Sequence, residues 1–214
     1  MGMGQLILND VRKTIKGRCV LNGISLTIDS GKVYGFKGAN GSGKTMLFRA
    51  IAGLVRIDSG TIDVFGKRLG RDLSFPDSIG LTIENVGFWP HLTGSECLET
   101  LRHIKNTAPK SSVKNAMIRM GLDPNDPRKY SAYSLGMKQK LAIAQAIMET
   151  PELLVLDEPN AGLDDASVDR LRTILLEEKV RGALVLISSH EGELLNGVCD
   201  SVLHIADGTV SSIH

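Results

Sequence analysis

The sequence predicts an α/β fold with a mostly parallel sheet. Short apolar runs of strand length alternate along the chain with stretches in which apolar residues recur at helical spacing. A glycine-rich segment at 38–45 lies between such a run and such a stretch, as is common where a parallel strand leads into a helix. The 214 residues suit one hydrophobic core with a small inserted lobe. We therefore expect a single domain over residues 1–214.

Residues 1–83 are predicted to be rich in strands. Four runs have the length and composition of strands and have Gly, Asn or Asp near their ends. These runs are Leu6–Leu8, Ser25–Ile28, Val33–Phe36 and Thr61–Val64. A helix running toward Ala52 follows the glycine-rich segment. This part of the chain is expected to supply the first half of the α/β core.

Residues 84–150 are predicted to form a helical lobe. Thr93 and Glu96 have the spacing of a capping box, and the apolar residues after them recur at helical spacing. Ser111 or Ser112 is expected to cap the next helix. The lobe therefore interrupts the alternation of strand and helix.

The alternation returns in residues 151–214. Leu153–Leu156 is an apolar run short enough for a strand that is buried on both faces. The stretch from Asp164 to Arg181 is predicted to be helical, with acidic residues early and basic residues late, which complements the helix dipole. A further strand is expected at Ala183–Ile187. We expect this part of the chain to complete the α/β core begun by residues 1–83.

Composition argues against several classes of protein. Twenty-five Lys and Arg residues nearly balance 24 Asp and Glu residues, and no basic block is present, so nucleic-acid binding is not expected. No apolar run approaches the ~20 residues needed to span a bilayer, and the N-terminus lacks the pattern of a signal peptide. We expect a cytosolic chain that needs a partner for any role at a membrane.

The glycine-rich segment has the pattern of a P-loop, Gly-Ala-Asn-Gly-Ser-Gly-Lys-Thr. Glycines at these positions let backbone N–H groups turn toward an oligophosphate, the lysine reaches the outer phosphates, and the threonine hydroxyl holds Mg²⁺. The alternative is an ordinary glycine-rich turn, but the strand before it and the helix after it favour nucleotide binding. The residues predicted to bind nucleotide are Gly38, Asn40, Gly41, Ser42, Gly43, Lys44 and Thr45.

Two acidic residues follow the apolar run Leu153–Leu156. Asp157 is predicted to orient Mg²⁺, and Glu158 to polarise the water that attacks the γ-phosphate. Buried strands often end at a polar residue near solvent, so this pair alone does not define a site. With a P-loop upstream, the pair predicts hydrolysis of a nucleoside triphosphate.

Two further positions have a structural and a functional interpretation. His190 ends another apolar strand and is expected near the γ-phosphate, although a single histidine at a strand end is usually an ordinary polar residue. Ser134 is a suitable N-cap for a helix, and Gly136 leaves N–H groups open in its first turn. This helix start is either a second anion-binding end or an ordinary capped helix with a solvated basic face.

Taken together, these segments resemble the ATP-binding-cassette (ABC) ATPases over nearly the whole chain. Tyr133–Met137 stands where the family signature Leu-Ser-Gly-Gly-Gln is expected and keeps its serine and second glycine. The resemblance implies a P-loop NTPase core with a mostly parallel sheet, an N-terminal antiparallel β subdomain and an inserted helical lobe. It also implies ATP and Mg²⁺ as ligands.

The resemblance implies a head-to-tail dimer with two ATP molecules between the subunits. In such a dimer Ser134 and Gly136 of one subunit contact the γ-phosphate that the other subunit holds. Asp164 lies in a segment that is similar to the family's D-loop, which passes between subunits. Glu158 matches the catalytic glutamate, and His190 matches the switch histidine.

The chain departs from the family pattern at two places. Glu84 is the nearest counterpart of a glutamine that normally faces Mg²⁺ or water. This glutamate and the Tyr-Ser-Leu-Gly-Met signature are similar to the bacitracin and lantibiotic resistance branch of bacterial exporters. Ile15 lies near the place of an aromatic residue that stacks on adenine, with Val20 as the alternative apolar wall. We therefore expect poor discrimination between ATP and GTP.

Trp89 lies in an apolar stretch before the first predicted helix of the lobe. It is either a core residue under the lobe or part of the groove that receives a membrane subunit in ABC transporters. The resemblance implies an ATPase subunit at the cytoplasmic face of the membrane that powers a separate integral permease, with efflux of an antibiotic peptide or lipid-like compound as the function of the branch. Two alternatives are a soluble ABC-type ATPase acting on a cytosolic partner, such as an iron–sulfur assembly complex, and a nucleotide sensor without useful turnover.

Overall fold

The computed structural model describes residues 4–83, 87–189 and 194–213. The strands are β1 Gln5–Ile15, β2 Arg18–Asp29, β3 Val33–Lys37, β4 Ser59–Val64, β5 Lys67–Arg68, β6 Ile79–Thr82, β7 Leu153–Leu156, β8 Leu184–Ser189, β9 Ser201–Ala206 and β10 Thr209–Ile213. The helices are α1 Lys44–Ile51, α2 Gly94–Lys105, α3 Ser111–Arg119, α4 Leu135–Ile147 and α5 Asp165–Val180. A short 3₁₀ helix covers Tyr130–Ala132.

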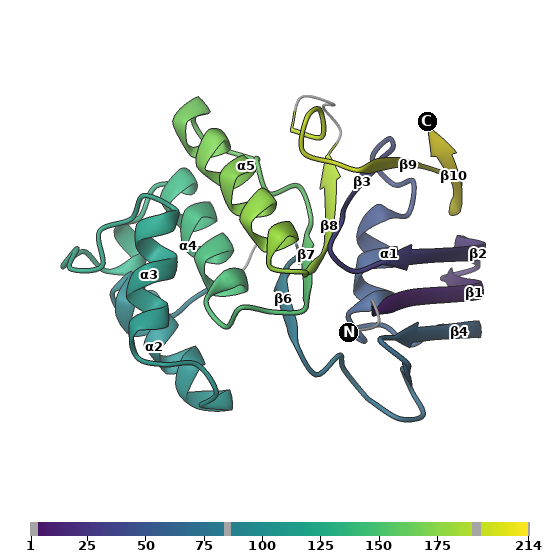
Figure 1. The fold of residues 1–214 in the computed structure, drawn as a ribbon, viewed down its shortest axis with the longest axis horizontal. Coiled ribbons are helices and arrows are strands. Elements are labelled where there is room, and N and C mark those ends of the chain that lie inside the picture. The colour runs from purple at the N-terminus through teal and green to yellow at the C-terminus, as the bar shows by residue number, and fades with distance from the viewer. Residues whose placement is uncertain (1–3, 84–86, 190–193, 214) are drawn as a thin grey trace.

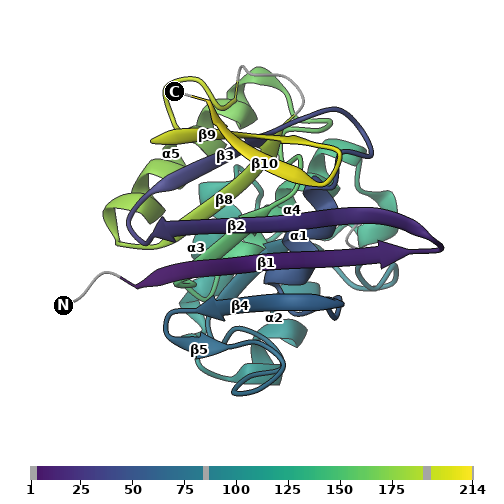
Figure 2. The same cartoon turned by 90° about the vertical axis from the view of Figure 1, so that its right-hand side faces the viewer.

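The strands form two sheets, which Figures 1 and 2 show from two sides. The larger sheet has the order β10-β9-β3-β8-β7-β6, and all its neighbours are parallel except β10, which runs antiparallel to β9. The smaller sheet has the order β2-β1-β4-β5 and is antiparallel. The prediction of a mostly parallel α/β core with an N-terminal antiparallel sheet is confirmed.

Both faces of the larger sheet are buried. Successive residues of a strand point to opposite faces, so neighbouring residues pack against different layers. Leu154 and Val185 pack with the residues of α4 and α5, whereas Leu153 and Leu184 pack with α1 and the antiparallel sheet. Figure 1 shows α1 between the two sheets and α4 and α5 beyond the other face. This arrangement explains why these strands are continuous apolar runs.

Helices α2, α3 and α4 lie together on one side of the larger sheet (Figure 1). The predicted capping box is confirmed: the Thr93 hydroxyl accepts a hydrogen bond from the Glu96 N–H, and the Glu96 carboxylate accepts one from the Thr93 N–H. The expected cap of α3 is wrong. Its N-cap is Lys110, which makes no capping bond, and Ser111 and Ser112 are already inside the helix. None of the described helices is long and apolar enough to cross a membrane.

Candidate active site

The P-loop connects the end of β3 to the start of α1. Glycine is required at two of its positions by close backbone contacts. A Cβ on Gly38 would lie 2.2 Å from the Ile205 carbonyl oxygen, and one on Gly43 would lie 2.8 Å from that of Val20. Gly43 is also the N-cap of α1, has a φ of 112° and makes no side-chain capping bond. The first N–H groups of α1 are therefore available to a phosphate.

The side chains of the P-loop are arranged around the same helix start. Lys44 is only 5% exposed, and its Nζ donates hydrogen bonds of 2.8 and 3.1 Å to the carbonyl oxygens of Gly38 and Ala39. The Ser42 hydroxyl is buried and has no hydrogen-bond partner among the described residues. An oxygen atom of a bound phosphate could accept a hydrogen bond from this hydroxyl. Asn40 and Gly41 are exposed at the outer part of the loop.

Thr45 and Asp157 come together although they are 112 residues apart in the chain. The Thr45 hydroxyl donates a 2.6 Å hydrogen bond to the Asp157 Oδ2, because β7 ends beside the start of α1. The other carboxylate oxygen, Oδ1, accepts a 2.5 Å bond from the hydroxyl of Ser188 at the end of β8. A hydroxyl and a carboxylate are the hard oxygen donors that Mg²⁺ prefers, so this pair fits the predicted metal.

Glu158 follows directly and has an unusual main chain. Its φ is 49°, in the left-handed region that is uncommon for residues other than glycine. Its N–H donates a 2.9 Å hydrogen bond to the Ser188 hydroxyl. The structure therefore places the main chain of Glu158 beside Ser188, which also contacts Asp157.

The signature segment contacts the loop after Glu158. The Ser134 hydroxyl caps α4 by accepting a 3.2 Å bond from the Met137 N–H, which confirms the predicted cap. A Cβ on Gly136 would lie 2.8 Å from the Gly162 carbonyl oxygen, so glycine is needed for this close approach. In Figure 1, α4 and α1 lie on opposite sides of the larger sheet. The helix that Ser134 caps therefore lies on the other side of the sheet from the helix that follows the P-loop.

Asp164 is the N-cap of α5, next to the signature segment. Its Oδ1 accepts a 2.8 Å hydrogen bond from the Ser167 N–H and a further bond from the Ser167 hydroxyl. These hydrogen bonds hold the pKa of the Asp164 carboxyl below its usual value, and Lys140, 3.7 Å away, lowers it further. Asp164 is exposed, so a partner molecule can reach it.

The remaining predicted residues are Val20, which lies beside the P-loop, Ile15 and Trp89, and two that lie outside the described residues. Val20 lies beside the P-loop through its carbonyl oxygen, whereas Ile15, at the end of β1, exposes 36% of its surface. Glu84 and His190 lie outside the described residues. Trp89 is 37% exposed and is therefore not a fully buried core residue.

Sequence reasoning missed two residues of the site. Ser188 contacts both Asp157 and the Glu158 main chain, and the Gln139 Nε2 on α4 donates a 3.0 Å bond to the Pro159 carbonyl oxygen. The only signal for Ser188 in the sequence was its place directly after the apolar run Ala183–Ile187, at the end of a predicted strand. Gln139 gave no such signal because its contact depends on how α4 packs.

Comparison with known proteins agrees with this geometry. The model of the ABC transporter family matches residues 21–161. The chain is 43% identical over 206 residues to YybJ, an uncharacterised ABC transporter ATP-binding protein of Bacillus subtilis (strain 168), covering 96% of this chain and 94% of that protein. It is 36% identical to the bacitracin transport ATP-binding protein BcrA of Enterococcus faecalis, covering 91% of this chain and 66% of BcrA.

The fold also matches a solved structure. A dimeric structure of MJ0796, a bacterial ABC transporter cassette, superposes with a TM-score of 0.87 at 21% identity, covering 96% of each chain. The similarity to transport proteins disfavours a soluble ATPase that acts on a cytosolic partner. The chain belongs to the ABC transporter family, as one of its ATPase subunits.

Proposed function

We propose that this chain hydrolyses Mg²⁺-bound ATP in a dimer and thereby powers a separate membrane permease from the cytoplasmic face of the membrane. The convergence of the P-loop, Asp157 and Glu158 at one edge of the larger sheet is the observation that supports this proposal. Substrate phosphates, metal and attacking water all have a suitable group there. We propose that residues 84–150 form a lobe inserted between the core segments 1–83 and 151–214. This lobe transmits the closure of the dimer on ATP to the permease.

Each group has one task in this proposal. The N–H groups of the P-loop and Lys44 bind the phosphates, and Thr45 and Asp157 hold Mg²⁺, which neutralises charge on the transferred phosphoryl group. Glu158 orients and polarises the attacking water. Glu84 and His190 are retained as a metal-facing residue and a γ-phosphate sensor.

The position of the signature segment supports the proposed dimer. Ser134 and Gly136 mark a helix start suited to an anion, but α4 lies on the other side of the sheet from α1 and the P-loop. A second, similar chain in head-to-tail orientation would bring this helix start to the γ-phosphate. Asp164 is exposed at the same surface and would lie between the subunits.

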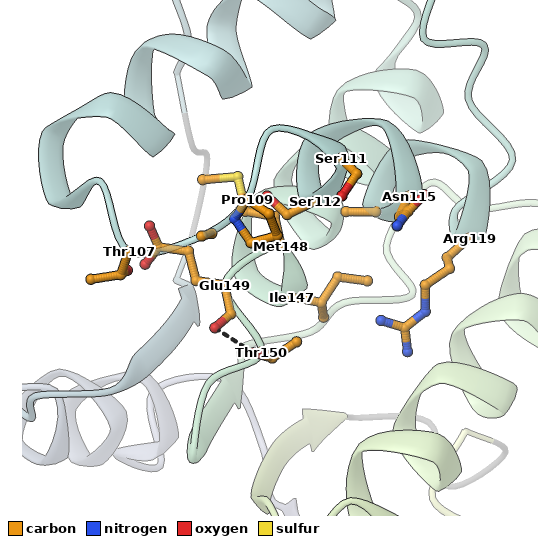
Figure 3. Close-up of a pocket in the computed structure, with 12 residues that line it drawn as sticks. Thr107, Pro109, Ser111, Ser112, Asn115, Arg119, Ile147, Met148, Glu149 and Thr150 are labelled. Atoms are coloured by element: carbon orange, nitrogen blue, oxygen red, sulfur yellow. Dashed lines mark hydrogen bonds between the residues drawn. The ribbon is translucent and has the colours of Figure 1, made fainter.

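The permease contact is proposed on the surface of the helical lobe. Trp89 is partly exposed, whereas its neighbour Phe88 is buried and packs edge-on against Tyr130 at 5.3 Å. A cavity of about 380 Å³ lies between the α2–α3 loop, α3 and the end of α4, and its lining includes Pro109 and Ile147 (Figure 3). A partly exposed tryptophan and a partly apolar recess on this lobe both suit a helix presented by a membrane protein.

The cargo is proposed from the relatives. BcrA is a bacitracin transport protein, so we propose efflux of an antibiotic peptide or a lipid-like compound. In this proposal the permease selects the cargo, since the ATPase subunit contributes nucleotide binding and closure.

Recovery of partners tests the transport role. Glu158→Gln is expected to trap the closed dimer, so the tagged variant should be purified from native membranes with Mg²⁺ and ATP. Recovery of an integral membrane protein, lost in a Trp89→Ala variant that still binds ATP, is the expected result. Recovery of soluble partners alone would contradict the transport role. A different result bears on Trp89: if most of the Trp89→Ala chain fails to fold but the soluble fraction still binds the permease, Trp89 belongs to the core.

A further inference from the structure

The hydroxyl of Ser188 links two acidic residues of the proposed hydrolytic site. It donates a 2.5 Å hydrogen bond to the Asp157 Oδ1 and accepts a 2.9 Å bond from the Glu158 N–H. A serine hydroxyl has one proton to donate and accepts through its lone pairs, so it can make both bonds together. One side chain therefore connects the carboxylate assigned to Mg²⁺ with the main chain of the residue assigned to water.

The sheet register brings Ser188 to this place. Strands β7 and β8 are parallel, with Leu156 opposite Ile187, so the next residues along the two strands are Asp157 and Ser188. Ser188 is fully buried in a strand whose preceding residues are apolar. Burial of a hydroxyl is unfavourable unless it is hydrogen-bonded, and packing alone would be served by an apolar residue. Its two bonds to the site explain why a polar residue is tolerated there.

The main chain that Ser188 holds is strained. Glu158 has a φ of 49° and precedes Pro159, and a residue before proline normally prefers an extended main chain. Such a conformation persists only when its surroundings fix it. Neighbouring peptides are also held, since the Asp157 N–H donates to the Thr82 carbonyl oxygen at 2.8 Å and the Pro159 carbonyl oxygen accepts from Gln139 at 3.0 Å.

We propose that Ser188 is a positioning residue for ATP hydrolysis. Its hydroxyl fixes the Asp157 carboxylate and the Glu158 peptide relative to each other, so that the metal-facing and water-facing carboxylates keep one geometry. This inference rests on the proposed function, because it assigns Ser188 a role through the two acidic residues and not through contact with ATP.

A matched pair of variants separates the hydroxyl from the volume of the side chain. Ser188→Thr keeps the hydroxyl, whereas Ser188→Val has a methyl group in place of the threonine hydroxyl and a side chain of nearly the same size. Both side chains are β-branched and suit a strand. Ser188→Val is expected to lower kcat about 10- to 100-fold with the KM for ATP changed less than about threefold. Ser188→Thr is expected to keep kcat within about threefold of the wild type.

A binding measurement adds a readout that does not depend on turnover. Mg²⁺ is expected to strengthen ATP binding in the wild type and in Ser188→Thr, and to strengthen it less in Ser188→Val, because the Asp157 carboxylate is then held less firmly. Thermal melting identifies the variants that fold. If Ser188→Val does not fold, Ser188→Ala replaces it, because the smaller alanine side chain also lacks the hydroxyl and adds no volume to the strand.

Two outcomes would overturn the proposal. In one, a folded variant without the hydroxyl retains the wild-type kcat and the wild-type effect of Mg²⁺ on ATP binding. In the other, Ser188→Thr and Ser188→Val lose both equally, so that volume and not the hydroxyl is responsible. If the wild-type chain releases no phosphate from ATP, the proposed function fails, but the Mg²⁺ dependence of ATP binding still tests the role of Ser188.

Discussion

Single residues in this chain have properties that only their neighbours explain. The Glu158 main chain is left-handed because hydrogen bonds from the strands and helix around it hold the three peptides at 157–159. Asp164, Cys97 and Cys199 are further examples, since their ionisation depends on local hydrogen bonding or burial.

Asp164 is expected to make the stability of the chain depend on pH. Hydrogen bonds from Ser167 lower the pKa of the folded carboxyl below 3.8, so the charged cap stabilises the fold above that pH and loses its effect as the pH falls through the folded pKa. At pH 7 the melting temperature should decrease in the order wild type, Asp164→Asn, Asp164→Ala. The difference between wild type and Asp164→Asn should shrink as the pH falls from 7 to below 3.8, through the lowered pKa of the folded carboxyl. A difference that stays constant over this range would contradict the prediction.

The cysteines are expected to differ in reactivity. Burial raises the pKa of Cys199 to about 12 and also raises that of Cys97, whereas Cys19 is exposed on β2. Since the thiolate is the reactive form, a thiol reagent at pH 8 should modify one cysteine quickly in the folded chain and all three after denaturation. Cys19→Ser should remove the fast phase. Survival of that phase would contradict the prediction, since Cys97 or Cys199 would then be the reactive thiol.

At the scale of elements, strand ends and helix starts determine where the site lies. The sequence allowed prediction of the P-loop, the run before Asp157 and the caps at Thr93 and Ser134, because these depend on neighbours in the chain. It did not reveal the full length of β1 and β2, whose pairing contains register shifts that disturb the alternation of residues. Ser188 was missed for a related reason, since its contact with Asp157 depends on pairing between strands that are distant in sequence.

Packing between β6 and α4 is expected to be intolerant of added volume. A Cβ on Gly80 would lie 1.9 Å from the Ala146 carbonyl oxygen, which belongs to the backbone of α4. Gly80→Ala should therefore lower the free energy of unfolding by about 1–3 kcal/mol, as overpacking commonly does. Gly87→Ala is the control, because a Cβ there would have no atom within 4 Å. Equal denaturation midpoints for the two variants would contradict this account of the β6–α4 contact.

At the scale of the whole molecule, the two sheets enclose α1, and we propose that the base of the nucleotide lies beside the β1–β2 hairpin. Ile15, 36% exposed, and Val20 offer an aliphatic wall in place of an aromatic ring. Aliphatic contact distinguishes purines poorly, so ATP and GTP should bind with affinities within about tenfold of each other. Ile15→Tyr should tighten the binding of both nucleotides through stacking. Fluorescence titration measures both predictions, and a hundredfold weaker affinity for GTP in the wild type would contradict the first.

The arrangement of α1 and α4 on opposite sides of the sheet makes the dimer central to the proposed function. The most direct test is phosphate release from ATP with Mg²⁺ by the wild-type chain and by Glu158→Gln, with the oligomeric state measured in the same samples. We predict that the wild type releases phosphate, and that Glu158→Gln releases it at least about 100-fold more slowly and forms a dimer that requires ATP. An unchanged rate in Glu158→Gln would contradict the assignment of Glu158 and with it the proposed mechanism.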